Sequence, residues 1–135
     1  MKKTLYLDKR GCPFWDDDKI NEVSNVGNYR VTTGDYTIKG KDGNTYFLEF
    51  SNWDRYTYRT TNKRTGKPLK HAVKEALLLN ALHVNTQFKN DAGTWGNLKL
   101  ESKLHEKPML YTLENILKIV NEISVDTYDK IEFLN

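Results

Sequence analysis

The chain has 135 residues, of which 38% are hydrophobic, 12% aromatic and 29% charged. That length predicts one domain spanning 1–135, and the apolar content excludes a disordered chain because it suffices for a core. No apolar run approaches the roughly 18 residues that cross a bilayer, and the charged start lacks the apolar stretch of a signal peptide, so we expect a cytoplasmic protein with no membrane contact.

The N-terminal part of the chain predicts a strand followed by a short helix. Leu5 and Leu7 alternate with polar residues over 4–8, which is typical of a strand. Three aspartates precede apolar residues at helical spacing over 16–26, where the helix dipole favours acidic side chains. Gly27 is a suitable end for this helix.

Residues 28 to 61 have the pattern of antiparallel strands. β-Branched and aromatic residues predominate in 29–33, 36–39, 44–50 and 53–61. Asp42-Gly43 lies between two of these runs and is a strong hairpin signal. We expect three or four strands joined by tight turns.

The next segment is predicted to be the central helix. Pro68 suits the first turn of a helix, and mostly apolar residues fill 68–83. After it we expect a strand over 84–89, a turn, a return strand over 94–101 and a polar connector over 103–108.

The C-terminal part predicts a second main helix and a last short strand. Thr112 is a good N-cap, and apolar residues keep helical spacing from Leu113 to about Ser124. A final strand is expected over 128–134. The predicted fold class is α+β: a twisted antiparallel sheet of five to six strands, with two main helices packed on one face and a short N-terminal helix.

Positive charge is concentrated in one segment of the chain. Residues 55–74 contain seven Lys or Arg and no acid, whereas the net charge of the whole chain is only +3. Arginine binds phosphate through two N–H groups, and aromatic rings stack on bases. The candidate contact residues are Arg55, Tyr56, Tyr58, Arg59, Lys63, Arg64, Lys67, Lys70 and Lys74. The alternatives are a solvated strand and loop, with the two tyrosines in the core or on the sheet surface.

Metal binding and covalent catalysis find little support. His71 and His83 are separated by about 18 Å along the predicted helix, so they cannot share an ion. His105 and the aspartates at 16–18 lack the ligand spacing of a metal site. Cys12 is the only cysteine and has no nucleophile motif around it. We therefore predict no cofactor and no metal.

One set of residues has a spacing found in enzymes. Asp91 precedes Glu101-Ser102-Lys103, with a predicted hairpin between them, and this resembles the signature of the PD-(D/E)xK nuclease family. The resemblance implies carboxylates that hold Mg²⁺ and a lysine that positions water. The alternative is a turn aspartate and two surface charges.

A non-catalytic binding protein is the preferred interpretation. Its partner is nucleic acid or the acidic face of a nucleic-acid-handling protein. The Lys-, Asn- and Tyr-rich composition and small size are typical of phage and other mobile-element proteins, which suggests an inhibitor of a host enzyme such as a CRISPR effector, in the manner of anti-CRISPR proteins. The alternatives are a direct DNA- or RNA-binding accessory protein and a small Mg-dependent nuclease. Edge strands leave both a monomer and a homodimer open.

Overall fold

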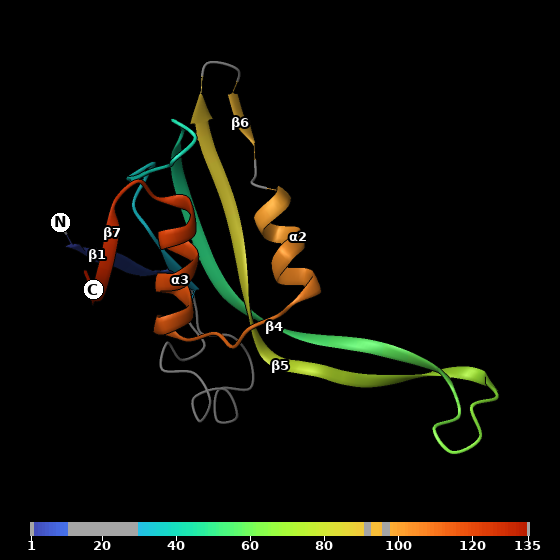
Figure 1. The fold of residues 1–135 in the computed structure, drawn as a ribbon. Coiled ribbons are helices and arrows are strands. Elements are labelled where there is room, and N and C mark those ends of the chain that lie inside the picture. The colour runs from blue at the N-terminus through green and yellow to red at the C-terminus, as the bar shows by residue number, and fades with distance from the viewer. Residues whose placement is uncertain (1, 11–29, 91–92, 96–97, 135) are drawn as a thin grey trace.

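The computed structural model describes residues 2–10, 30–90, 93–95 and 98–134 (Figure 1). These residues form a strand-rich α+β structure, which agrees with the predicted class. The predicted helix over 16–26 and Cys12 lie outside the described residues. Neither described helix has the length and apolar character that a membrane crossing requires.

Seven strands form one sheet, and they are β1 (Lys2–Arg10), β2 (Arg30–Thr32), β3 (Ile38–Lys39), β4 (Thr45–Thr61), β5 (Pro68–Asn90), β6 (Gly93–Trp95) and β7 (Thr127–Phe133). Their order is β6-β5-β4-β2-β1-β7, and β3 pairs with β4 beside this path. The pairs are antiparallel except that β7 runs parallel to β1. The sheet is therefore mixed at this edge. Strand β7, which follows α3 in the chain, runs in the same direction as β1.

The core lies between the sheet and the helices α2 (Leu98–Glu106) and α3 (Leu113–Ile123). Alternate residues of β4 and β5 are buried in it, as the period of two in a strand requires. Both helices contribute apolar side chains at helical spacing. The buried members from β4, β5 and the two helices include Leu48, Phe50, Leu82, Val84, Leu100, Leu104, Ile116 and Ile119.

The C-terminal elements agree with the prediction. The side chain of Thr112 accepts a hydrogen bond of 3.2 Å from the backbone N–H of Asn115, so it caps α3 as expected. Ile116, Ile119 and Val120 on one side of that helix are buried. The last strand, β7, closely matches the range predicted for it.

The predicted central helix over 68–83 is wrong, because this segment is the first part of β5. Strand β5 as a whole pairs with β4, from Thr61↔Pro68 to Thr45↔Lys89. Leu and Ala favour helices, but the long β-rich partner strand supplies a ladder that overrides this preference. The burial pattern of Leu82, Val84 and Thr86 has a period of two.

Two further boundaries differ from the prediction. The segments 44–50 and 53–61 form one continuous strand, β4. The predicted strand over 94–101 ends at Trp95, and α2 occupies most of the predicted connector over 103–108. Leu100 and Leu104 lie one helical turn apart and are both buried, so packing against the sheet favours the helix there.

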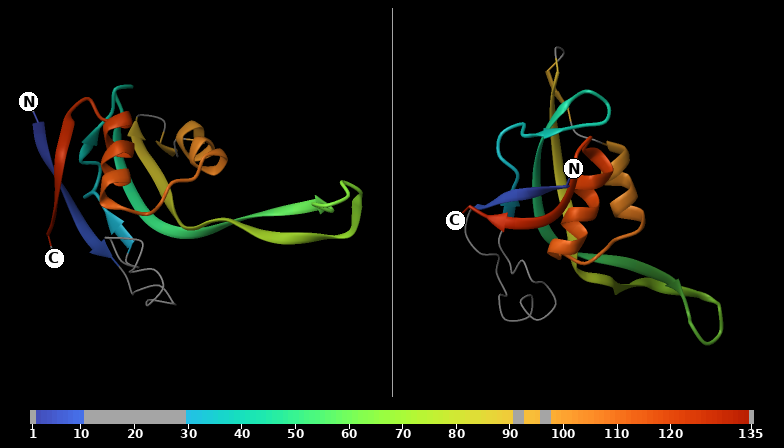
Figure 2. Two further views of the ribbon diagram at one scale, coloured as in Figure 1. Left: turned by 60° about the horizontal axis from the view of Figure 1, so that its bottom comes forward. Right: turned by 60° about the vertical axis from the view of Figure 1, so that its left-hand side comes forward.

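The distal halves of β4 and β5 leave the body as a two-stranded ribbon (Figures 1 and 2). We call residues 54–80 the arm. The described core cluster contains no residue of the arm. Most arm side chains are exposed, because no other helix or strand among the described residues covers either face of the ribbon over most of its length.

Candidate functional site

The arm begins where the pairing of β4 with β5 becomes irregular. The register of β4 with β5 shifts on both sides of Arg55, and Asn80 has a left-handed φ of 58°. The carboxylate of Asp54 accepts a hydrogen bond of 2.9 Å from the backbone N–H of Asn80. The carbonyl of Asn80 accepts a second bond, of 2.9 Å, from the N–H of Tyr111 in the connection before α3. Such bulges bend and twist a ribbon, so they set the direction of the arm.

The cross-strand pairs divide the arm into two faces. Residues paired across an antiparallel ribbon project to the same side. Tyr56 pairs with Ala76 and Tyr58 pairs with Lys74, and we call this side the tyrosine face. Its opposite, the glutamate face, is made by the pairs Thr57↔Glu75 and Arg59↔Val73.

Tyrosine and lysine side chains lie together on the tyrosine face. The ammonium of Lys74 lies 4.1 Å from the centre of the Tyr56 ring, which is a cation–π contact. The side chain of Tyr58 is 62% exposed. The two tyrosines are therefore surface residues of the sheet, and the alternative that placed them in the core is wrong.

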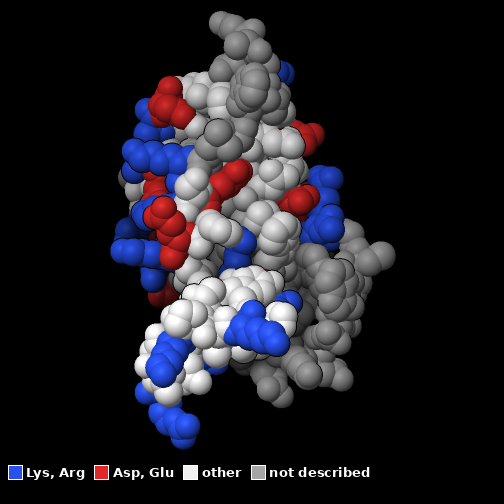
Figure 3. Space-filling model, turned by 90° about the vertical axis from the view of Figure 1, so that its right-hand side faces the viewer, with Lys and Arg blue, Asp and Glu red and all other residues white. Residues whose placement is uncertain are grey.

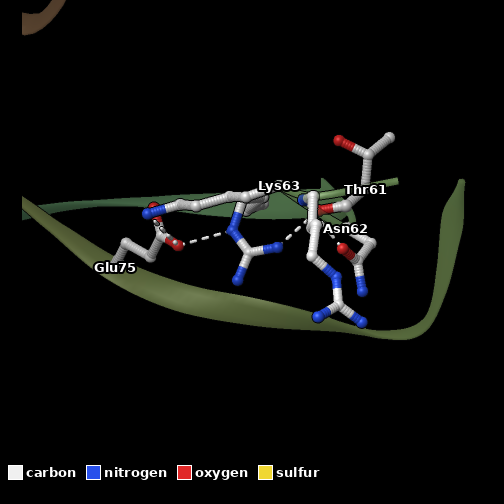
Figure 4. Close-up of polar contacts among 6 residues, drawn as sticks. Thr61, Asn62, Lys63 and Glu75 are labelled. Atoms are coloured by element: carbon white, nitrogen blue, oxygen red, sulfur yellow. Dashed lines mark hydrogen bonds and ion pairs between the residues drawn. The ribbon is translucent and has the colours of Figure 1, made fainter. Parts of the chain in front are cut away.

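The glutamate face contains an acid that pairs with two cations of the basic segment. Glu75 accepts a hydrogen bond of 2.6 Å from Nε of Arg59 and lies 3.6 Å from Nζ of Lys63 (Figure 4). Arg59 also donates to the carbonyl of Thr61. The hydrogen bond from Arg59 and the charge of Lys63 hold the pKa of Glu75 below its ordinary value, although partial burial opposes them. Glu75 thus offsets part of the charge of two cations.

The tip of the arm is an ordered turn that presents cations to solvent. The side-chain oxygen of Asn62 accepts hydrogen bonds from the N–H groups of Arg64, at 2.8 Å, and Thr65, at 3.1 Å. Gly66 completes the turn with a φ of 72°, which glycine adopts without strain. The side chains of Lys63, Arg64 and Lys67 are exposed around it.

The predicted contact residues all lie on the arm, and all but Arg55 lie beyond its base. Arg55 is half-buried at its base, where Nη1 lies 3.2 Å from Nδ1 of His105. The other cations surround the ribbon and its tip instead of forming one flat face. Where Figure 3 shows the arm, Lys and Arg side chains are separated by uncharged ones. The whole arm contains seven cations and two acids, so its net charge is +5.

Three apolar residues of the arm were missed by the sequence analysis. Val73, Leu77 and Leu79 are exposed, each by at least 40%. The predicted helix would have buried them against the sheet. No signal in the sequence separates them from core residues, because their exposure follows from the ribbon projecting beyond the body.

Of the nuclease-like spacing, the structure describes Glu101 and Lys103, and it does not bring their charged groups together. Glu101 and Lys103 lie on α2, and their side chains have different partners. Glu101 accepts a hydrogen bond of 2.8 Å from the hydroxyl of Thr86, whereas Lys103 pairs with Glu122 at 3.0 Å. Asp91 lies outside the described residues. Within the part of the chain that is described, no three His, Cys, Asp or Glu side chains form a group that could hold a metal ion.

No family model, curated protein or solved structure matches the chain. The arm is the feature that most departs from an ordinary globular surface, since it combines exposure, positive charge and aromatic side chains. We therefore infer the function from the chemistry of the arm.

Proposed function

We propose that this chain is a non-catalytic binding protein that holds nucleic acid with its arm. The observation that carries the proposal is a projecting two-stranded ribbon with seven cations, two acids and no core beneath it. A ribbon of this kind is marginally stable in water, and its like charges repel one another. A polyanion laid against the arm would remove that repulsion.

The shape of the arm suits a phosphate backbone. A two-stranded ribbon fits the major groove of a duplex, and cations on both faces and at the tip then reach phosphates on either side of it. Arg64 and Lys67 at the tip are exposed, as is Lys74 on the tyrosine face. Tyr58 adds an exposed ring beside these charges, on which an unpaired base can stack.

Salt-dependent binding to labelled DNA and RNA oligonucleotides tests this function. Measured by fluorescence anisotropy, the affinity should fall steeply between about 50 and 200 mM salt, because each phosphate contact releases counterions. Reversing three arm charges (Arg59→Glu, Lys63→Glu, Arg64→Glu) should abolish binding. The matched control reverses three exposed lysines of the body: Lys107→Glu, Lys118→Glu and Lys130→Glu. If both triple variants lose the same affinity, only net charge matters and the arm is not the site.

A second candidate function is inhibition of a nucleic-acid-handling host enzyme, as a phage-borne protein would exert it. The observation in its favour is the exposure of Val73, Leu77 and Leu79, which a phosphate backbone would leave uncovered. A cationic arm cannot imitate nucleic acid, so it would bind an acidic surface of the enzyme. Capture from native lysate separates the two: a protein partner stays bound after nuclease treatment, whereas nucleic acid does not.

A further inference from the structure

A cleft of about 490 Å³ lies where the arm joins the body. Trp53 and Arg55 of β4 and His83 of β5 line one side, and Glu101 and His105 of α2 line another. That volume is within the range of sites that bind small molecules. Arg55 belongs both to this cleft and to the basic segment, so the cleft lies at the base of the arm.

An ordered aromatic platform forms part of the cleft wall. The rings of Trp53 and His83 are stacked with their centres 4.0 Å apart and their planes 7° from parallel. Burial, and then the charge of Arg55, hold the pKa of His83 below its usual range, so the imidazole is neutral at neutral pH. The indole of Trp53 nevertheless remains 51% exposed. The guanidinium of Arg55 also lies against this ring, so a further flat ring would meet the part of the indole that Arg55 and His83 leave exposed, at little cost in side-chain entropy.

Charged side chains of both signs line the same cleft, and two of them, Arg55 and Glu101, have groups that a ligand could meet. Among the described contacts, the Arg55 side chain makes a single hydrogen bond, to His105, and its Nε–H is buried without a partner. The guanidinium carbon of Arg55 also lies 5.5 Å from the centre of the Trp53 ring, a cation–π contact that holds this group beside the indole. Glu101 is held by the backbone N–H and the hydroxyl of Thr86, both at one carboxylate oxygen. The pair offers donors and an acceptor at fixed places.

This combination of groups selects the class of ligand. A flat ring whose edge carries both acceptors and donors matches an aromatic platform flanked by a guanidinium and a carboxylate. Nucleobases with an exocyclic amino group have such an edge. A free phosphate does not match, since Glu101 and Glu106 both line the cleft and would repel it.

We propose that the cleft binds one unpaired nucleobase, which stacks on Trp53 and forms hydrogen bonds through its edge with Arg55 and Glu101. The proposal rests on the proposed function, because the arm would hold the strand to which the base belongs. It adds that the protein recognises a single-stranded segment or strand end beside the arm. A base inside a duplex is stacked on both sides and cannot enter the cleft.

The test compares a single-stranded oligonucleotide with an abasic phosphodiester chain of the same length. Both present the same charge, but only one has bases. Trp53→Ala should weaken binding of the base-containing strand about tenfold, the loss expected for one stacked base, and leave binding of the abasic chain unchanged. The control is Tyr6→Ala, which removes a ring of similar exposure, 52%, from β1 and should change neither affinity.

A second measurement keeps Trp53 in place. In a Trp15→Phe and Trp95→Phe background, Trp53 is the remaining indole, and the base-containing strand should quench its fluorescence while the abasic chain does not. Oligo-dC should bind more tightly than oligo-dT, because cytosine has an amino donor at one end of its edge and two acceptors beside it, to match Glu101 and Arg55. Thymine instead has one N–H donor between two carbonyl acceptors. Equal loss of both ligands on Trp53→Ala, or no quenching, overturns the base site while the arm keeps its function. Binding of neither ligand by the unmodified protein overturns both proposals.

Discussion

The carboxylate of Asp54 accepts a hydrogen bond of 2.9 Å from the backbone N–H of Asn80, across the ribbon where the arm begins. Asn80 is buried and has a left-handed φ of 58°, so its N–H has no regular ladder partner there. Asp54 supplies the missing acceptor. The direction of the arm is thus fixed by one side chain and one unusual backbone conformation.

The left-handed conformation predicts an unusual order of stabilities at position 80. The Asn80→Gly variant should have a free energy of unfolding about 1 kcal/mol higher than that of the Asn80→Ala variant, because glycine adopts positive φ without strain. Both variants also remove the amide group of Asn80, whose two polar atoms are buried without a described hydrogen-bond partner. Denaturant unfolding followed by circular dichroism measures the difference.

Asn85 on the same strand provides the control for this prediction. It is exposed and pairs with Glu49 in regular β-structure. There Asn85→Gly should be less stable than Asn85→Ala, since glycine weakens an ordinary strand by about 0.5–1 kcal/mol. The same order of stabilities at both positions would contradict the conformation described for Asn80.

The ion pair on the glutamate face predicts how Glu75 titrates. Its pKa should lie below the ordinary 4.5, and Arg59→Gln should raise it towards that value because the strongest contact is lost. Lys63→Gln should raise it less, since its contact is 3.6 Å instead of 2.6 Å. A lowered pKa means that the stabilising contribution is present above the ordinary pKa and is lost as the pH falls through the lower one. Carbon-detected NMR titration of the carboxyl group checks the order of the three values.

The sequence predicted well those elements whose local signals agree with the fold. Thr112 with its apolar helix and the Asp42-Gly43 turn were found because caps and turns act over a few residues. The segment 68–83 was missed because its composition favours a helix, and only pairing with a distant strand decides otherwise. Helix α2 was missed because, among its side chains that the structure describes, two buried leucines, Leu100 and Leu104, mark its inner side.

The candidate site was predicted in composition but not in shape. The run of cations from Arg55 to Lys74 could be counted, and its interleaved tyrosines were visible. Its partial neutralisation by Glu75 depended on strand register, which no local pattern specifies. The stacking of Trp53 on His83 likewise joins two residues that lie far apart in the chain and meet only through the pairing of β4 with β5.

Removal of the acid on the glutamate face should strengthen nucleic-acid binding. Glu75→Gln frees Arg59 and Lys63 for phosphate contacts, so the affinity should rise and the salt dependence should steepen by about one counterion. Fluorescence anisotropy across a salt series measures both quantities. Glu132→Gln changes the net charge equally and also frees a lysine, Lys130, but in β7. If Glu132→Gln increases affinity as much as Glu75→Gln does, Arg59 and Lys63 do not contact phosphate.

Excision of the arm should separate binding from folding. Because Tyr56 and Ala76 pair directly across the ribbon, residues 57–75 can be replaced by Asn-Gly, which forms a tight hairpin turn between them. The core cluster contains no residue of this segment, so the free energy of unfolding should change by only about 1 kcal/mol. Six of the seven cations of the arm are removed, and nucleic-acid binding should be lost.

The shortened protein is best measured beside a full-length variant in which the six removed cations are replaced by glutamine: Arg59→Gln, Lys63→Gln, Arg64→Gln, Lys67→Gln, Lys70→Gln and Lys74→Gln. Both should unfold cooperatively and neither should bind, because the phosphate contacts come from the charges and not from the length of the ribbon. Retained binding by the glutamine variant would assign the contacts to the tyrosines and apolar residues of the arm instead. Retained binding by the shortened protein would place the site on the body and contradict the proposed function.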